Sequence, residues 1–212
     1  MLNSEAMKNR GKFITFEGIE GSGKSTQIEK VFQFLKSKNH DAIQSLEPGG
    51  TKIGKEFRRI LLSPTMEFAS KYSELLLFYV DRLEHVENLI LPSLKQGKVV
   101  LCDRYIDSSY AYQIGGRNMP EELLQDLNKL VNLQPDITIL LDIAPEVSLE
   151  RARLRSAFDR FEQEQLDFHI RVRERYLVQA KREPERIKVI KADNLNPQEV
   201  FEEIVKILNK HL

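Results

Sequence analysis

The residues most able to do chemistry in this sequence form a glycine-rich loop near its N-terminal end. Two glycines, a lysine and a serine fit the pattern G-x-x-x-x-G-K-[ST], which runs from Gly18 to Ser25. Backbone N–H groups of such a loop surround phosphate oxygens, and the lysine adds positive charge. An apolar segment at 12–16 precedes the loop and an amphipathic segment at 26–38 follows it, as a strand and a helix would. This context favours a nucleotide-phosphate site over a chance glycine turn, with contacts expected from Gly18, Ile19, Glu20, Gly21, Ser22, Gly23, Lys24, Ser25 and Thr26.

A second glycine-rich cluster, Glu-Pro-Gly-Gly-Thr, occupies residues 47–51. Alone it is typical of an ordinary turn, although glycines also allow a ligand to approach the backbone closely. Arg58 and Arg59 follow on a predicted helix; paired arginines usually form a solvated face, but one could turn toward a phosphate. Phe78 and Arg82 lie one turn apart on the next predicted helix, where ligand binding and plain helix packing explain the spacing equally well.

A third cluster begins with Asp103 and Arg104, directly after a short apolar run. The pair could form a structural salt bridge. In a protein with a phosphate-binding loop, however, an acid here commonly organises Mg²⁺ and an arginine holds phosphate through its planar fork. Tyr112 and Gln113 add an aromatic wall and an amide that can read the edge of a base.

A fourth cluster contains four arginines within ten residues: Arg151, Arg153, Arg155 and Arg160. Such a run is most often a solvated face or a patch that binds polyanions. Beside a phosphate-binding loop, it also fits a small mobile lid whose closure brings positive charge to a transferring phosphoryl group.

Short apolar strands alternate with amphipathic helices along the whole chain. Strands are predicted at 13–18, 42–46, 99–101, 137–141 and 187–190. Helices are predicted from residue 24 to 38 and at 53–63, 71–97, 108–113, 120–133, 145–155, 162–182 and 197–208, and Pro92 could kink or shorten the helix over 71–97. The alternation predicts an α/β fold with a five-stranded parallel sheet covered by helices on both faces. Ligands of such sheets bind beyond the carboxyl ends of the strands, where the first three clusters fall.

Composition indicates a soluble globular protein. The chain has 212 residues, 41% hydrophobic and 30% charged, and its 32 basic residues balance 32 acidic ones. A neutral chain gives no general reason to expect nucleic acid or a membrane as partner. Cys102, the single cysteine, is interpreted as a buried apolar side chain rather than a nucleophile. Residues 1–11 are polar and predicted to be frayed, without a signal peptide's apolar centre, so we expect one domain over 12–212 in the cytoplasm.

With these motifs in this order, the chain resembles the thymidylate kinases, nucleoside monophosphate kinases that have the P-loop NTPase fold. The resemblance covers roughly residue 12 to the C-terminus and rests on segments 16–26, 47–51, 77–82, 103–113 and 159–162. The segment 103–113 is the most family-specific, because deoxynucleoside kinases usually carry Glu-Arg-Ser in place of Asp103-Arg-Tyr. Adenylate kinases usually have a proline in the glycine loop and a different lid. One departure is Ile114, where the family often has glycine.

The resemblance implies a role for the residues of the donor side and for the phosphate of the acceptor. Lys24 should contact the ATP phosphates, while Ser25 and Asp103 should lie on the side of Mg²⁺. Arg58 and Arg104 match the arginines that hold the phosphate of dTMP.

The resemblance also assigns the nucleoside part of the acceptor. Glu20 matches the loop carboxylate that holds the sugar 3′-hydroxyl, and Tyr112 the tyrosine that favours deoxyribose over ribose. Phe78 matches the ring that stacks on thymine, and Arg82 the cation at the thymine carbonyl edge. Further acceptor contacts are expected from Pro48, Ser108 and Gln113.

The glycine loop has no arginine among its variable residues, which resembles the bacterial type of the family, whose lid provides the catalytic cations. The lid should span about 151–162, and we favour Arg155 as its acting residue, with Arg153 and Arg160 in support.

The resemblance therefore implies phosphorylation of dTMP to dTDP by Mg·ATP, a step in dTTP synthesis, carried out by a homodimer. Two alternatives are weighed. One is a kinase for another nucleoside monophosphate or a deoxynucleoside. The other is a P-loop nucleotide switch or a nucleic-acid-associated ATPase.

Overall fold

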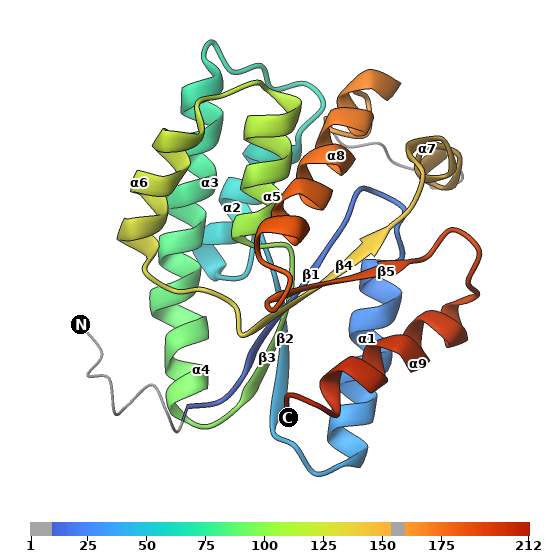
Figure 1. The fold of residues 1–212 in the computed structure, drawn as a ribbon. Coiled ribbons are helices and arrows are strands. Elements are labelled where there is room, and N and C mark those ends of the chain that lie inside the picture. Colours follow the sequence, from blue (N-terminus) through green and yellow to red (C-terminus); the bar gives the residue numbers. More distant parts are fainter. Residues whose placement is uncertain (1–9, 154–159) are drawn as a thin grey trace.

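A five-stranded parallel sheet forms the centre of the molecule in the computed structural model, which describes residues 10–153 and 160–212 (Figure 1). In the order β2-β3-β1-β4-β5, it contains β1 (Phe13–Glu17), β2 (Ala42–Leu46), β3 (Val99–Asp103), β4 (Ile137–Asp142) and β5 (Ile187–Lys191). Each strand begins at its predicted residue and ends within two residues of the predicted end. The predicted α/β fold with a parallel sheet is confirmed.

Helices cover both faces of this sheet. Figure 1 shows α1 and α9 on one face and α3, α4 and α6 on the other. The helical segments are α1 (Lys24–Ser37), α2 (Lys52–Leu62), α3 (Lys71–His85), η1 (Val86–Ile90), α4 (Leu91–Lys95), α5 (Ile106–Ser109), η2 (Tyr110–Gly116), α6 (Glu121–Val131), α7 (Pro145–Arg153), α8 (Leu166–Arg182) and α9 (Pro197–Leu208), where η marks π-helix. None of them, within the described ranges, has the length and apolar character needed to cross a membrane.

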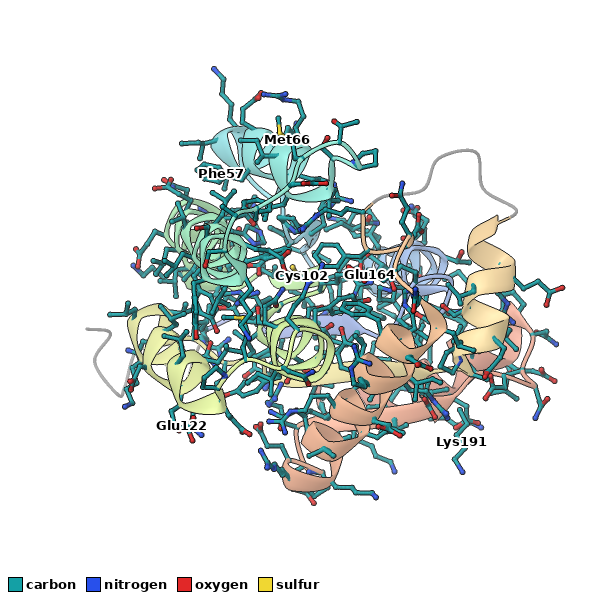
Figure 2. The ribbon with its side chains drawn as sticks, turned by 90° about the horizontal axis from the view of Figure 1, so that it is seen from above. Phe57, Met66, Cys102, Glu122, Glu164 and Lys191 are labelled. Carbon is teal, nitrogen blue, oxygen red and sulfur yellow. The ribbon has the colours of Figure 1, made fainter. Side chains whose placement is uncertain are left out.

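Side chains that alternate along the strands contribute to two hydrophobic cores, one on each face of the sheet. In β3, Val99 and Leu101 face the core shared with α1 and α9, while Val100 and Cys102 face the core shared with α3 and α4. Successive side chains of a strand point to opposite faces, so a strand buried on both sides is apolar throughout. Cys102 is fully buried, as predicted, and Figure 2 shows it in the middle of the molecule.

The helix predicted over 71–97 continues through a π-helical turn rather than breaking. Segment η1 ends two residues before Pro92, which is the second residue of α4. Proline has no N–H and its ring crowds the preceding turn. A local π-turn is a known way to absorb such a disturbance within a helix. Proline therefore changes the helix type here without ending the helix, which runs to Lys95.

The helix predicted over 108–113 is longer than expected, since α5 passes into η2 and the helical stretch ends at Gly116. Two glycines at its end allow close packing against α8. A Cβ on Gly115 would lie 2.8 Å from the carbonyl oxygen of Arg171, and one on Gly116 would lie 2.4 Å from the Phe168 ring. Ile114 is part of this helix and packs against the core.

The start of a helix and the N-terminal segment also differ from prediction. Helix α8 begins at Leu166 instead of residue 162, because residues 160–164 form turns and a bend. Phe161, in this segment, lines the pocket described below. At the N-terminal side, the predicted frayed segment included Arg10, but its guanidinium contacts both carboxylate oxygens of Asp136 at 2.8 and 3.0 Å. Residues 1–9 lie outside the described residues.

Candidate active site

The glycine-rich loop joins the end of β1 to the start of α1 and needs glycine for its backbone. Gly18, Gly21 and Gly23 have φ of 138°, 71° and 94°, in the left-handed region that favours glycine. Space is also limited: a Cβ on Gly18 would lie 2.5 Å from the carbonyl oxygen of Leu141. Gly23 caps α1 and Lys24 is its first residue, so the helix N-terminus faces the loop as the sequence predicted.

Lys24 lies inside the loop and is 7% exposed. Its Nζ donates to the carbonyl oxygens of Gly18 and Ile19, both at 3.0 Å. Burial, and then the charge of Arg104, lower the pKa of Lys24 to about 8, against the opposing effect of Asp103 and other carboxylates. A third hydrogen-bond partner of Lys24 Nζ is also neutral, the Ser22 hydroxyl at 3.5 Å. A buried ammonium group with neutral hydrogen-bond partners would gain strongly from a polyanion, because an opposite charge favours its protonated form.

Ser25 and Asp103 bring two hard oxygen ligands together beside Lys24. Ser25 Oγ lies 3.3 Å from Asp103 Oδ2, and Asp103 Oδ1 is buried with no hydrogen-bond partner among the described residues. Mg²⁺ prefers oxygen ligands and is usually held by one or two protein groups together with phosphate oxygens and water. The pair fits such an ion, and it does not form part of a larger cluster: residues 10–153 and 160–212 contain no group of three or more His, Cys, Asp and Glu placed to bind a metal.

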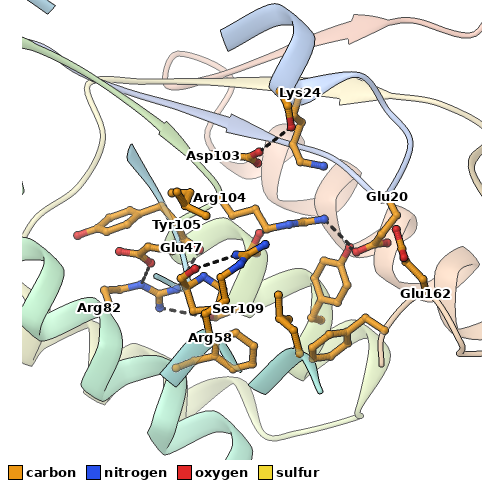
Figure 3. Close-up of a pocket in the computed structure, with 18 of the residues that line it drawn as sticks. Glu20, Lys24, Glu47, Arg58, Arg82, Asp103, Arg104, Tyr105, Ser109 and Glu162 are labelled. Carbon is orange, nitrogen blue, oxygen red and sulfur yellow. Dashed lines mark hydrogen bonds and ion pairs between the residues drawn. The ribbon is translucent and has the colours of Figure 1, made fainter. Parts of the chain in front are cut away.

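A pocket of about 220 Å³ opens next to this loop at the carboxyl ends of the strands (Figure 3). The register explains why distant segments meet here: Asp103 pairs with Phe16 of β1 on one side and with Leu46 of β2 on the other. All the predicted acceptor residues line this pocket: Glu20, Pro48, Arg58, Phe78, Arg82, Arg104, Ser108, Tyr112 and Gln113. Gly21, Gly23, Lys24, Ser25, Thr26 and Asp103 line it as well.

Arg104 and Glu20 form an ion pair at the mouth of the loop (Figure 3). Arg104 Nη2 donates to Glu20 Oε1 at 2.9 Å, and the Tyr112 hydroxyl donates to the same oxygen at 2.5 Å. The Arg104 guanidinium also lies 4.9 Å from the centre of the Tyr112 ring. Burial acts to raise the pKa of Glu20, but Arg104, the His169 imidazole, Lys24 and Tyr112 together hold this pKa well below its usual range. Glu20 is therefore ionised at neutral pH and acts as an acceptor.

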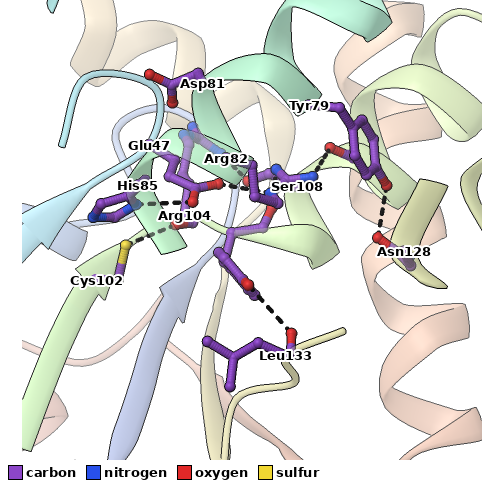
Figure 4. A network of polar contacts seen from close by, with 12 residues as sticks. Glu47, Tyr79, Asp81, Arg82, His85, Cys102, Arg104, Ser108, Asn128 and Leu133 are labelled. Carbon is purple, nitrogen blue, oxygen red and sulfur yellow. Dashed lines mark hydrogen bonds and ion pairs between the residues drawn. The ribbon is translucent and has the colours of Figure 1, made fainter. Parts of the chain in front are cut away.

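Arg82 is 2% exposed and lies beneath the pocket in a network of fixed contacts (Figure 4). Its Nε donates to Glu47 Oε2 at 2.8 Å, its Nη1 to Ser109 Oγ at 3.0 Å and its Nη2 to the carbonyl oxygen of Tyr105 at 3.0 Å. Glu47 Oε1 is 2.9 Å from His85 Nδ1. The structure thus gives Arg82 protein partners on all three nitrogens, a different set from the thymine edge that we expected.

Loop 47–51 is held over this network. The backbone N–H of Gly49 donates to Asp81 at 3.1 Å, and Arg58 Nη1 donates to the carbonyl oxygen of Pro48 at 2.8 Å. The Glu47–Pro48 peptide bond is cis. Arg58 therefore projects from α2 across the loop and into the pocket, while Arg59 on the same helix is exposed and pairs with Glu56.

Aromatic rings form the far wall of the pocket. Phe161, which we did not predict as a site residue, lies 6.1 Å from Phe78 and 5.5 Å from Tyr112 between ring centres. Gln113 Nε2 donates to Glu74 Oε1 at 3.2 Å. The motif at 159–162 was recognised, but nothing in the sequence alone indicated that its phenylalanine would face Phe78.

The structure describes the arginines of the predicted lid only in part. Arg151 Nη1 lies 3.4 Å from the carbonyl oxygen of Gly21. Arg153 ends α7, and Arg155 lies outside the described residues. Arg160 lies on the acceptor side: its Nη1 is 2.6 Å from Glu74 Oε2 and its Nε is 3.2 Å from the carbonyl oxygen of Leu61.

Glu17, at the end of β1, was also missed. Its carboxylate accepts from the backbone N–H groups of Tyr105 and Ser108, from Ser108 Oγ at 2.6 Å and from the Tyr176 hydroxyl at 2.7 Å. Burial, and then the charge of Asp107, raise the pKa of Glu17 to about 7. Ser108 lines the pocket, yet its hydroxyl is engaged by Glu17. The one available signal for Glu17 was its position directly before the glycine loop. Tyr176 lies 159 residues further along the chain, on α8, and carried no signal.

Comparison with known proteins agrees with this geometry. The family model for thymidylate kinase matches residues 16–204. The thymidylate kinase of Maridesulfovibrio salexigens is 46% identical over 201 residues, covering 91% of this chain and 92% of that protein. The thymidylate kinase of Hahella chejuensis is 44% identical over 86% of this chain and 89% of its own length. The crystal structure of thymidylate kinase from Ehrlichia chaffeensis superimposes with a TM-score of 0.78 at 34% identity, covering 94% of this chain and 99% of that one. The chain belongs to the thymidylate kinase family and has its P-loop NTPase fold.

Proposed function

We propose that this protein transfers the γ-phosphoryl group of ATP to dTMP, giving dTDP and ADP. One observation carries the proposal: the loop that holds Lys24 and the pocket lined by Phe78 and Gln113 form a single continuous site, with Glu20 belonging to both. A phosphate oxygen of dTMP attacks the γ-phosphorus, and the bond from that phosphorus to the oxygen of ADP breaks. The attacking oxygen is already anionic, so positioning and charge neutralisation carry the catalysis and no strong base is needed.

On the donor side, Lys24 and the N–H groups of the loop would hold the β- and γ-phosphates. Phosphate oxygens would replace the carbonyls of Gly18 and Ile19 as partners of Lys24 Nζ. Ser25 and Asp103 would hold Mg²⁺, which supplies positive charge to the phosphates when bound. This assignment is supported by Asp103 Oδ1, which is buried and has no hydrogen-bond partner among the described residues.

On the acceptor side, Arg58 and Arg104 would bind the phosphate of dTMP, and Phe78 would stack on thymine with Phe161 closing the wall. Glu74 fixes the side-chain amide of Gln113 by accepting a hydrogen bond from Gln113 Nε2. The carbonyl oxygen of Gln113 would then accept a hydrogen bond from the N3–H of thymine. Glu20 would accept from the 3′-hydroxyl. Tyr112, whose hydroxyl is held by Glu20, would occupy the space that a 2′-hydroxyl needs.

Two arginines receive revised roles. The contacts of Arg82 with Glu47, Ser109 and Tyr105 support a bracing role under loop 47–51. Arg160, held by Glu74, would fix Phe161 in the base wall. Arg155, with Arg153, remains our proposal for the cations that reach the transferring phosphoryl group.

We also propose a cytoplasmic homodimer that acts on these small molecules, with neither nucleic acid nor a membrane as partner. An apolar stripe on α3 supports the dimer: Tyr72, Leu76 and Val80 follow one another at four-residue spacing and are 45%, 50% and 44% exposed. Light scattering should give twice the monomer mass, and Leu76→Glu should reduce it to the monomer value.

The substrate assignment is tested by an ADP-release assay with dTMP, dUMP, AMP, CMP, GMP and thymidine as acceptors. dTMP should give the highest kcat/KM. If AMP, CMP or thymidine gives the dominant turnover, that compound and not dTMP is the substrate. ATP hydrolysis without any acceptor would indicate a nucleotide switch. Lys24→Ala should abolish turnover while leaving the thermal unfolding transition in place; surviving activity would contradict the loop assignment.

A further inference from the structure

His169 on α8 is a fully buried histidine with one ring nitrogen close to a carboxylate of the site. It is 0% exposed, and within the described ranges neither of its ring nitrogens has a hydrogen-bond partner. A buried polar group without a hydrogen-bond partner destabilises the folded state. A histidine that served only to fill space beside Phe168 could be replaced by an apolar ring without this cost.

The group nearest to the imidazole is the loop carboxylate. His169 Nδ1 lies 3.6 Å from Glu20 Oε2, just beyond hydrogen-bond distance. Glu20 Oε2 is itself buried and, among the described residues, lacks a hydrogen-bond partner. A small rotation of either side chain would pair the two atoms.

The contacts at the other oxygen show what such a pair would add. Glu20 Oε1 accepts from both Arg104 and Tyr112, so this oxygen is fixed in place. The terminal torsion of a glutamate is broad, and two bonds to one oxygen leave the plane of the carboxylate free to turn. A contact at Oε2 would set that plane, and with it the direction of the lone pairs that face the pocket.

We propose that His169 is a positioning residue for the acceptor: its Nδ1–H donates to Glu20 Oε2 and orients the carboxylate for the sugar 3′-hydroxyl. The inference rests on the proposed function, since it takes Glu20 as the group that binds this hydroxyl. The inference goes beyond the proposed function because it gives a residue of α8 a role in orienting a carboxylate of the phosphate-binding loop.

The test compares His169→Phe, which keeps a ring of similar size, with His169→Asn, whose amide N–H can replace Nδ1–H. We measure kcat and KM for dTMP and for 3′-deoxy-dTMP at saturating Mg·ATP, with His40→Phe at an exposed position as the matched control. For His169→Phe, we expect KM for dTMP to rise about three- to tenfold, as for loss of a hydrogen bond to a charged group acting through another residue. KM for 3′-deoxy-dTMP and for ATP should stay within about twofold of wild type, and His169→Asn should recover part of the loss.

Equal increases for dTMP and 3′-deoxy-dTMP would overturn the inference, because they would indicate a steric effect on the whole pocket. Unchanged KM values in both variants would overturn it as well. Glu20→Gln separates this failure from that of the proposed function. If wild type prefers dTMP over its 3′-deoxy form and Glu20→Gln loses the preference while His169→Phe keeps it, only the role of His169 is wrong. If wild type shows no such preference, the role proposed for Glu20 fails and that of His169 falls with it.

Discussion

Replacing Arg82 by methionine separates the two roles that this residue could have. Arg82→Met keeps most of the apolar stem and removes the guanidinium. If Arg82 reads thymine, the change should affect dTMP binding and leave the free protein stable. If Arg82 braces the floor of the pocket, as its partners indicate, the change should destabilise the free protein.

The structure gives the size of the expected effect. The substitution removes one hydrogen bond to the buried Glu47 carboxylate, and one each to Ser109 Oγ and the Tyr105 carbonyl. Breaking a buried ion pair by removing one partner costs about 3–5 kcal/mol. For a protein of this size, about 2–4 °C of Tm is lost per kcal/mol, so Tm should fall by about 6–20 °C.

Thermal unfolding of the ligand-free protein, followed by circular dichroism, measures this change directly. Arg59→Met is the matched control, because Arg59 and its partner Glu56 are 70% and 66% exposed in their side chains. Exposed pairs contribute about 0–1 kcal/mol, so this variant should unfold within a few degrees of wild type. A Tm of Arg82→Met close to that of wild type, together with a large rise in KM for dTMP, would refute the bracing role and restore the base-contact hypothesis.

Two further predictions concern the donor side. The pKa of Lys24 in the free protein is lowered to about 8, so the ammonium group loses its proton as pH rises above that value. We therefore expect kcat/KM for ATP to decline above about pH 8. The value of kcat should hold to higher pH, because bound phosphates raise the pKa of Lys24 again. Lys24→Arg, which stays charged, should be less active but lack this decline, and a flat wild-type profile from pH 7 to 10 would contradict the reasoning. Asp103→Asn should raise the Mg²⁺ concentration for half-maximal activity about ten- to a hundredfold at fixed ATP; an unchanged Mg²⁺ titration would remove Asp103 from the metal site.

Local sequence signals predicted the strands and the residues that follow them. Each polar cluster after a strand, such as Asp103 with Arg104, lies where the carboxyl end of that strand must lie in a parallel sheet. The π-helical turns were not predictable, because they arise from proline and from close packing on α8. Partners of buried charges were not predictable either: Arg82 looked the same in sequence whether it faced a base or Glu47, and packing alone decides between the two.

The contacts that sequence predicts least well are those that join the donor side and the acceptor side of the site. Glu17 and Glu20 flank the start of the glycine loop, and each is contacted by residues of the 103–113 segment and of α8: Ser108 and Tyr176 contact Glu17, while Tyr112 and His169 lie against Glu20. Helix α8 follows the proposed lid, residues 151–162, in the chain. A shift of α8 on lid closure would therefore move the partners of both carboxylates together, and the contact to the acceptor sugar would change with the position of the lid. If this coupling operates, dTMP should bind more tightly in the presence of a non-hydrolysable ATP analogue than alone, and the gain should shrink in His169→Phe, since by linkage each ligand changes the affinity of the other by the same factor.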